Sequence, residues 1–136
     1  MFLVMLNKKE QEYFLELANI AMNVDGVIME SELHMLEMFR KETDLQEYVI
    51  KNIPIDKLKI YVDTSTKRNK KVFLFELAGM LYADEEIAPE ERDWLFDIAT
   101  SWGFRESEMK KIIRWVMDFN DLLAEGFEYI NQKERL

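Results

Sequence analysis

Residues 72–99 read VFLFELAGMLYADEEIAPEERDWLFDIA, and this stretch decides the fold. Up to Ala83 its only charged residue is Glu76, which predicts a helix that other helices surround on almost every side. Pro89 suits the first turn of a second helix, because its fixed φ is helical and its missing N–H needs no partner there. The stretch therefore predicts two helices joined by an acidic turn that contains Asp84.

The same pattern occurs earlier in the chain, where residues 14–39 read FLELANIAMNVDGVIMESELHMLEMF. A shift of 59 positions, the separation of the two turn aspartates, aligns both turns on D-x-x-I-x-x-x-E. The aligned pairs are Asp25 with Asp84, Ile28 with Ile87, Glu32 with Glu91 and Leu36 with Leu95. This recurrence predicts an internally duplicated helix-turn-helix, with copies at about residues 13–41 and 72–102.

Apolar residues recur at helical spacing through most of the remaining chain. They predict helices at about residues 8–23, 30–41, 44–50, 67–83, 89–102 and 106–123, and a helix of about two turns that starts near Pro54. Only four glycines and two prolines interrupt the chain, which favours long helices over hairpins. The sequence thus predicts one all-α domain over residues 1–136, a bundle of about seven helices.

The same spacing predicts which side chains face inward. In the 72–99 stretch, near-complete burial is expected for Leu77, Leu81, Ile87, Leu95 and Ile98. Elsewhere the inward set is Leu33, Leu36, Phe39, Leu58, Tyr61, Met109, Ile112, Ile113, Val116, Met117 and Leu123. We also expect the last helix to kink or end at Gly126, with Phe127, Tyr129 and Ile130 docking as a final turn. The basic residues between Asp63 and Lys71 are expected to form an exposed connection.

Composition excludes several kinds of site. There is no cysteine, which excludes disulfides, thiolate metal ligands and cysteine nucleophiles. The single histidine, His34, cannot build a zinc site or a catalytic triad alone, and no phosphate loop or nucleophile elbow is present. A net charge of −9 repels nucleic acid and anionic membranes, and the apolar opening is too short to span a bilayer. We therefore expect a cytoplasmic, non-enzymatic domain that neither binds nucleic acid nor inserts into membranes.

The turn acids have a purely structural interpretation. An aspartate in a turn accepts backbone N–H groups. A glutamate near a helix start can fold back onto the N–H that precedes the helix, as in a capping box, and it meets the positive end of the helix dipole. In this interpretation Ile28 and Ile87 anchor the two turns in the core.

The functional interpretation is a metal site. If the duplicated turns lie side by side across a pseudo-twofold axis, their carboxylates converge and repel each other unless a proton or a cation intervenes. Oxygen ligands suit a hard divalent cation such as calcium or magnesium, although the EF-hand pattern is absent. The candidate metal ligands are Asp25, Glu32, Asp84 and Glu91.

The segments FLELA…DGVI…E and LAGMLYAD…IAPEE…LFDIATSWGF together resemble the TerB family of tellurite-resistance proteins and TerB-like domains. The resemblance implies a seven-helix bundle with an acidic, metal-binding surface and a role in tellurite resistance or stress. By position it carries over Asp25, Gly26, Glu32, Asp84 and Glu91. The chain departs from the family pattern at three positions, where Glu85 replaces the second glycine and Met29 and Ala88 replace capping serines.

An alternative function is a protein-interaction module without metal. Its surface would be the acidic face or a groove lined by methionines, since Met22, Met29, Met35 and Met38 cluster around the first turn. Methionine adapts to varied partners, although it also serves as ordinary core filler. Carboxylates from both turns in one place would favour a metal, whereas acids spread over an open face would favour a protein partner.

Overall fold

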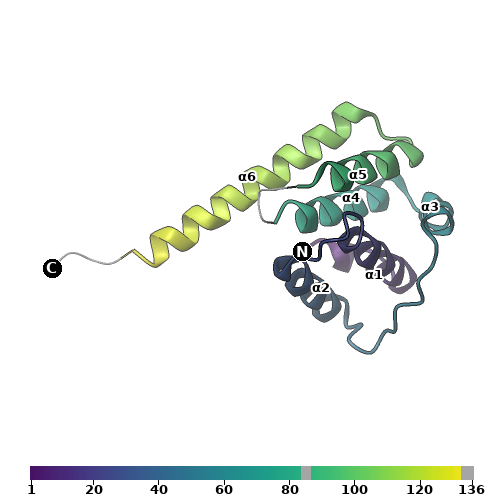
Figure 1. Cartoon of the computed structure of the whole chain (residues 1–136), viewed down its shortest axis with the longest axis horizontal. Helices are drawn as coiled ribbons and strands as arrows, with labels where there is room; N and C mark the ends of the chain where they lie inside the picture. The colour runs from purple at the N-terminus through teal and green to yellow at the C-terminus, as the bar shows by residue number, and fades with distance from the viewer. Residues whose placement is uncertain (84–86, 133–136) are drawn as a thin grey trace.

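The computed structural model describes residues 1–83 and 87–132, and these residues form helices and no strand. Figure 1 shows most of the helices gathered into a bundle and the C-terminal helix extending well beyond it. The elements are η1 (Leu3–Met5), α1 (Lys8–Met22), α2 (Glu30–Thr43), α3 (Ile55–Asp63), α4 (Lys67–Leu81), α5 (Pro89–Ser101) and α6 (Glu106–Ile130). The all-α prediction is confirmed, with six α-helices and one short 3-10 helix in the described residues in place of about seven helices.

The two predicted repeats correspond to the pairs α1–α2 and α4–α5. The bounds of α4 and α5 lie 59 residues after those of α1 and α2, except that α5 ends one residue earlier than this shift requires. In each pair the same number of residues, including an aspartate at the equivalent position, separates the two helices. The spacing found in the sequence is therefore also the spacing of the helices.

The helix predicted at residues 44–50 is absent. Asp44 adopts a left-handed conformation (φ 56°, ψ 42°) and ends α2, so the chain cannot continue into another helix at once. Further along, the N–H groups of Lys51 and Ile53 donate to the Glu16 carboxylate of α1 at 2.8 and 3.2 Å. Because the backbone of this segment bonds to a distant side chain, it remains a loop.

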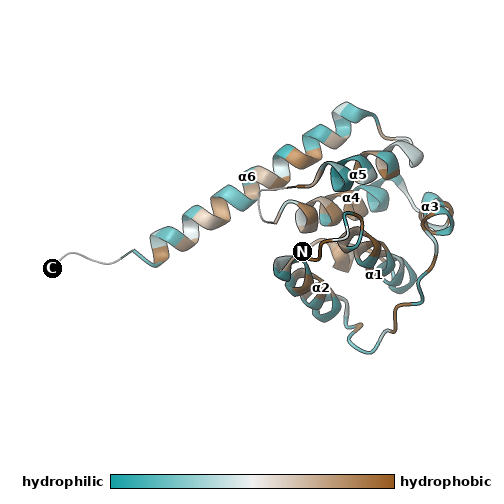
Figure 2. Cartoon of the chain, in the orientation of Figure 1, coloured by the Kyte–Doolittle hydropathy of each residue, from teal (hydrophilic) through white to brown (hydrophobic). Residues whose placement is uncertain are grey.

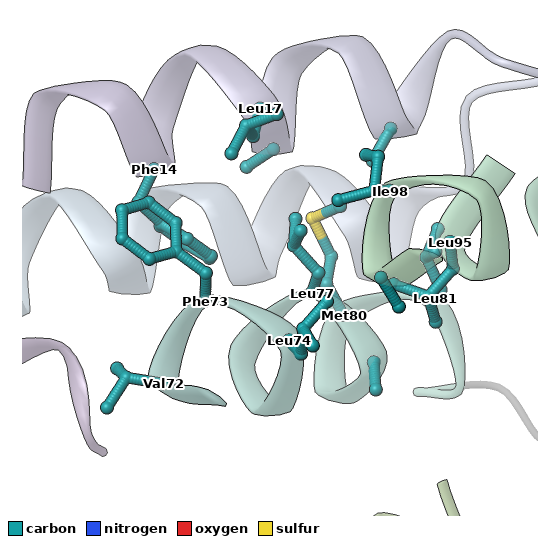
Figure 3. Packing of buried hydrophobic residues seen from close by; sticks show 14 of the residues in the cluster. Phe14, Leu17, Val72, Phe73, Leu74, Leu77, Met80, Leu81, Leu95 and Ile98 are labelled. Atoms are coloured by element: carbon teal, nitrogen blue, oxygen red, sulfur yellow. The ribbon is translucent and has the colours of Figure 1, made fainter. Parts of the chain in front are cut away.

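Helix α4 lies at the centre of the bundle and packs against α1, α2, α5, α6 and η1. Figure 3 shows its apolar side chains lying near Phe14 and Leu17 of α1 and near Leu95 and Ile98 of α5. Near-complete burial is confirmed for Leu77, Leu81, Leu95 and Ile98. It is wrong for Ile87, which is only half-buried because it lies in the turn before α5 and not on a helix face.

The first half of α6 packs on the bundle and the second half does not. Met109, Ile112, Ile113 and Val116 are buried as predicted, but Met117 and Leu123 are 43% and 48% exposed. The helix continues through Gly126 without ending, and Phe127, Tyr129 and Ile130 do not dock. Residues 121–130 are all exposed, and we call them the projecting turns (Figure 1).

Two further inward predictions are wrong. Leu33 is 48% exposed, because the apolar face of α2 that meets the bundle is narrower than its sequence spacing indicated. Tyr61 is 40% exposed and stacks on Tyr13, with ring centroids 5.3 Å apart, at the surface between α3 and α1.

Part of the basic 63–71 segment forms the first turn of α4, where Lys70 pairs with Asp63 at 2.8 Å.

No helix in the described ranges is both long enough and apolar enough to cross a membrane.

Candidate functional site at the paired acidic turns

The first acidic turn is shaped by Asp25 and Gly26. The Val27 N–H donates to Asp25 Oδ1 at 3.0 Å, and Gly26 adopts a φ of 76°, which only glycine adopts readily. The turn then enters α2, where the Met29 N–H donates to Glu32 Oε1 at 3.1 Å. Ile28 is 47% exposed, so the prediction that it anchors this turn in the core is wrong.

The second turn enters α5 in the same way. The Ala88 N–H donates to Glu91 Oε1 at 3.1 Å, and Pro89 occupies the first helical position. Neither Met29 nor Ala88 supplies a side-chain cap, so each helix start keeps the glutamate half of a capping box. Asp84, the fourth predicted ligand, lies with Glu85 outside the described residues.

The side chains of Glu32 and Glu91 meet between the two helix starts. Both side chains are almost completely buried, at 4% and 6% exposed. Burial raises the pKa of Glu91 to about 7, although the hydrogen bond from the Ala88 N–H acts in the opposite direction. The negative charges of Glu32 and Asp25 contribute to this raised pKa, which places Asp25 in the same electrostatic neighbourhood. The structure thus brings three of the four predicted ligands close enough to interact.

Burial and the neighbouring negative charges favour the protonated form of Glu91. Protonation of Glu91 lowers the repulsion that two buried negative charges would have. A hard cation could take the place of that proton, since the same oxygens are suitable ligands for calcium or magnesium. Over residues 1–83 and 87–132, no group of three or more histidine, aspartate or glutamate side chains is arranged to hold a metal ion. Glu32 and Glu91 could therefore supply carboxylate ligands to such an ion. Other groups would have to complete its coordination.

An apolar groove lies elsewhere on the molecule, between the N-terminal segment, α2, α4 and α6. It has a volume of about 480 Å³ and is lined mainly by apolar side chains, among them Met35, Met38, Phe75, Trp115 and Phe119. The sequence indicated its two methionines, but not the aromatic residues, because α4 and α6 supply these only after folding. Met22 belongs to the core, and Met29 lies exposed at the first turn.

A buried polar site that the sequence did not indicate is Glu16 on α1. The side chain is 1% exposed and accepts three hydrogen bonds from the 44–54 segment, one of them from the Tyr48 hydroxyl at 2.7 Å. The sequence signal that could have indicated this site is a glutamate on the otherwise apolar face of a helix. Since Glu16 already has these three partners, its role is structural.

No protein-family model, curated protein or solved structure matches this chain.

Proposed function

We propose that this chain is a non-enzymatic TerB-like domain that binds a divalent cation, calcium or magnesium, through Asp25, Glu32, Asp84 and Glu91. The observation that carries the proposal is the burial of the Glu32 and Glu91 carboxyl groups within electrostatic reach of each other. The two residues occupy equivalent positions of the two helix-turn-helix units, 59 residues apart. An internal duplication explains this equivalence, and a cytoplasmic role in tellurite resistance or stress would follow from the TerB-like resemblance.

Helix capping alone does not explain why Glu32 and Glu91 are buried near each other. One oxygen of each glutamate accepts the N–H at its own helix start, and an exposed glutamate serves that purpose equally well. Burying two carboxyl groups against each other instead costs free energy whenever both are ionised. A site that binds a cation benefits from that cost, because the ion relieves the repulsion. The proposal therefore predicts that protons and divalent cations compete for the same two side chains.

Without divalent ions, the stability of the protein is expected to fall as pH rises from about 4.5 to above 7. The Glu91 pKa is 4.5 in the unfolded chain and about 7 in the folded one, so across this window the folded state keeps a proton that the unfolded state has lost. The stabilisation is complete below pH 4.5 and is lost as pH rises through 7. It amounts to roughly 2–3 kcal/mol of unfolding free energy for this residue.

Urea denaturation at pH 5 and pH 8, in chelator, measures this change. In Glu91→Gln the dependence on pH should be smaller by that amount, because glutamine cannot titrate. Glu90→Gln is the matched control, because Glu90 is exposed on the same helix turn and should leave the dependence unchanged. Equal pH dependence in the wild type and Glu91→Gln would show that Glu91 does not carry the proton.

Divalent cations are expected to raise the melting temperature in proportion to the logarithm of ion concentration. The gain is about 2.7 kcal/mol when the free ion is at 100 times its dissociation constant. It should be larger at pH 8 than at pH 6, because the ion displaces a proton from the carboxyl pair. Thermal melts in chelator and in millimolar calcium or magnesium measure the response.

The variants Asp84→Asn and Glu91→Gln should abolish that response, and at pH 8 each should be at least as stable as the wild type in chelator because one repelling charge is gone. Glu90→Gln should keep the wild-type response. If all four proteins respond equally to the ions, the turns are structural motifs. That conclusion would be strengthened if Asp84→Asn were destabilised with and without ions.

A further inference from the structure

We infer that the apolar groove binds a small hydrophobic amine, with its ammonium group at Glu42 and Glu76 and its apolar part on the aromatic rings of the groove. The inference goes beyond the cation proposal and uses a different part of the molecule. It rests on the open space at Gly79, on the two carboxyl groups that line the groove, and on the ammonium group that they already hold.

Gly79 leaves open space in the lining of the groove. It lies within α4, and a glycine inside a helix destabilises that helix relative to alanine. A Cβ added at Gly79 would have no atom of another described element within 4 Å, so close packing between helices does not require the glycine. The equivalent position of the first repeat, 59 residues earlier, is occupied by Ile20. Gly79 therefore keeps open a space that a side chain at this position would fill.

The groove has the size and the surface of a small-molecule site. Its volume of about 480 Å³ lies within the range of roughly 300–1,000 Å³ that is typical of ligand pockets. Hydrophobic residues dominate the N-terminal segment and recur along α4, which both line it (Figure 2). Phe2, Phe75 and Trp115 contact one another with ring centroids 5.3–5.9 Å apart, and Trp115 remains 42% exposed. Packing within the chain thus fixes an aromatic surface before any ligand arrives.

The charged side chains of the groove are acidic. Among the described residues that line it, only Glu42 and Glu76 have charged side chains. Glu76 is 8% exposed and accepts the Phe2 N–H at 2.7 Å. Burial raises the pKa of Glu76, although the Phe2 N–H and the Met1 ammonium act in the opposite direction. Two carboxyl groups in such apolar surroundings favour a cationic ligand over an anionic one.

The same two carboxyl groups already hold one ammonium group. The Met1 amino group pairs with Glu42 and lies 3.4 Å from Glu76 Oε1. Met1 and Phe2 both line the groove, so this ammonium is attached to apolar groups as it would be in a hydrophobic amine. When both carboxyl groups are ionised, one ammonium neutralises one of the two charges. The ammonium of a ligand would neutralise the other, and the neighbouring aromatic rings would attract the same positive charge.

Titration with phenylbutylamine, followed in proton–nitrogen NMR correlation spectra, is the first test. The indole N–H signal of Trp115 should shift and saturate, whereas the signals of Trp94 and Trp102, which do not line the groove, should move little. Phenylbutanol, which has the same shape without the charge, should bind about tenfold more weakly or worse, because it forms no charge-assisted hydrogen bond. No saturable shift with millimolar amine, or equal affinity for the alcohol, would overturn the proposal.

Gly79→Leu tests the place of binding without removing any contact of the folded chain. The leucine side chain should fill the open space and abolish the response to phenylbutylamine, while the helical circular dichroism stays unchanged. Gly126→Leu is the matched control, because Gly126 is an exposed glycine of α6 outside the groove, and it should bind the amine as the wild type does. Undiminished binding in Gly79→Leu would place the amine elsewhere and refute the inference.

The carboxyl groups are tested by Glu42→Gln and Glu76→Gln. Each should weaken binding of phenylbutylamine about tenfold or more and leave that of phenylbutanol unchanged, because only the amine interacts with the lost charge. Glu37→Gln, at an exposed position of α2 outside the groove, should bind both compounds as the wild type does. Wild-type affinity for the amine in Glu42→Gln and Glu76→Gln would contradict the assigned role of the two acids. None of these results bears on cation binding at the acidic turns, which the melting experiments measure separately.

Discussion

Replacing Leu81 with alanine is expected to lower the free energy of unfolding by about 2–5 kcal/mol. Leu81 is 4% exposed at the carboxyl end of α4, and Figure 3 shows its side chain directed toward Leu95 of α5. Truncation removes apolar atoms from the core and leaves a cavity that helices on every side of α4 prevent from closing. Urea denaturation followed by far-ultraviolet circular dichroism measures the loss.

Ile60→Ala is the control for the Leu81 variant. Ile60 is 66% exposed on α3, so its truncation removes a similar number of methyl groups without opening a cavity, and the change should stay within about 0.5 kcal/mol. If Leu81→Ala cost as little as Ile60→Ala, the carboxyl end of α4 would not lie in the core. The position of the second acidic turn, which follows directly, would then need revision as well.

Replacing Glu16 with alanine is expected to cost about 3 kcal/mol or more, because each buried donor left without its acceptor costs roughly 1–3 kcal/mol. Three donors lose their acceptor together: the Tyr48 hydroxyl and the N–H groups of Lys51 and Ile53. Burial, together with the Glu16 carboxylate, raises the pKa of Tyr48 well above its usual value. The variant should therefore loosen the whole 44–54 loop as well as lower the stability.

Amide hydrogen exchange separates this local effect from a general loss of stability. In Glu16→Ala the Lys51 and Ile53 amides should exchange much faster than amides of α4, whereas in Leu81→Ala the core amides should lose protection. Glu37→Ala, at an exposed position of α2, should change neither stability nor exchange in the loop. Unchanged protection at Lys51 and Ile53 in Glu16→Ala would contradict the assigned hydrogen bonds.

The sequence predicted most helices closely because their signals are local. The apolar repeat and the turn chemistry at Gly26 and Pro89 depend only on neighbouring residues, and they give α1, α2, α4 and α5 to within a few residues. The 59-residue shift also identified Glu32 and Glu91 as equivalent positions. Their cap hydrogen bonds, three residues from donor to acceptor, were within reach of the same local reasoning.

Three features depended on contacts between residues far apart in the chain. The 44–50 segment has helical spacing, but hydrogen bonds to Glu16 keep the chain in this region a loop. Glu16 lies 35 residues before Lys51. The apolar face of α6 is plain in the sequence, yet only the packing of the bundle determines that its second half has no neighbour in the same chain. The burial of Glu32 and Glu91 within electrostatic reach of each other likewise depended on how the bundle packs.

The sequence by itself therefore determined the all-α class, the bounds of most helices and the identity of the turn acids. The tertiary structure decided which acids are buried near each other and which apolar stripe remains uncovered. The physical reason is the sequence separation of the residues that interact. A backbone hydrogen bond within a helix joins residues four apart, so local composition decides whether it forms. Burial and charge coupling between Glu32 and Glu91 depend on which helices pack together, and local composition does not specify that.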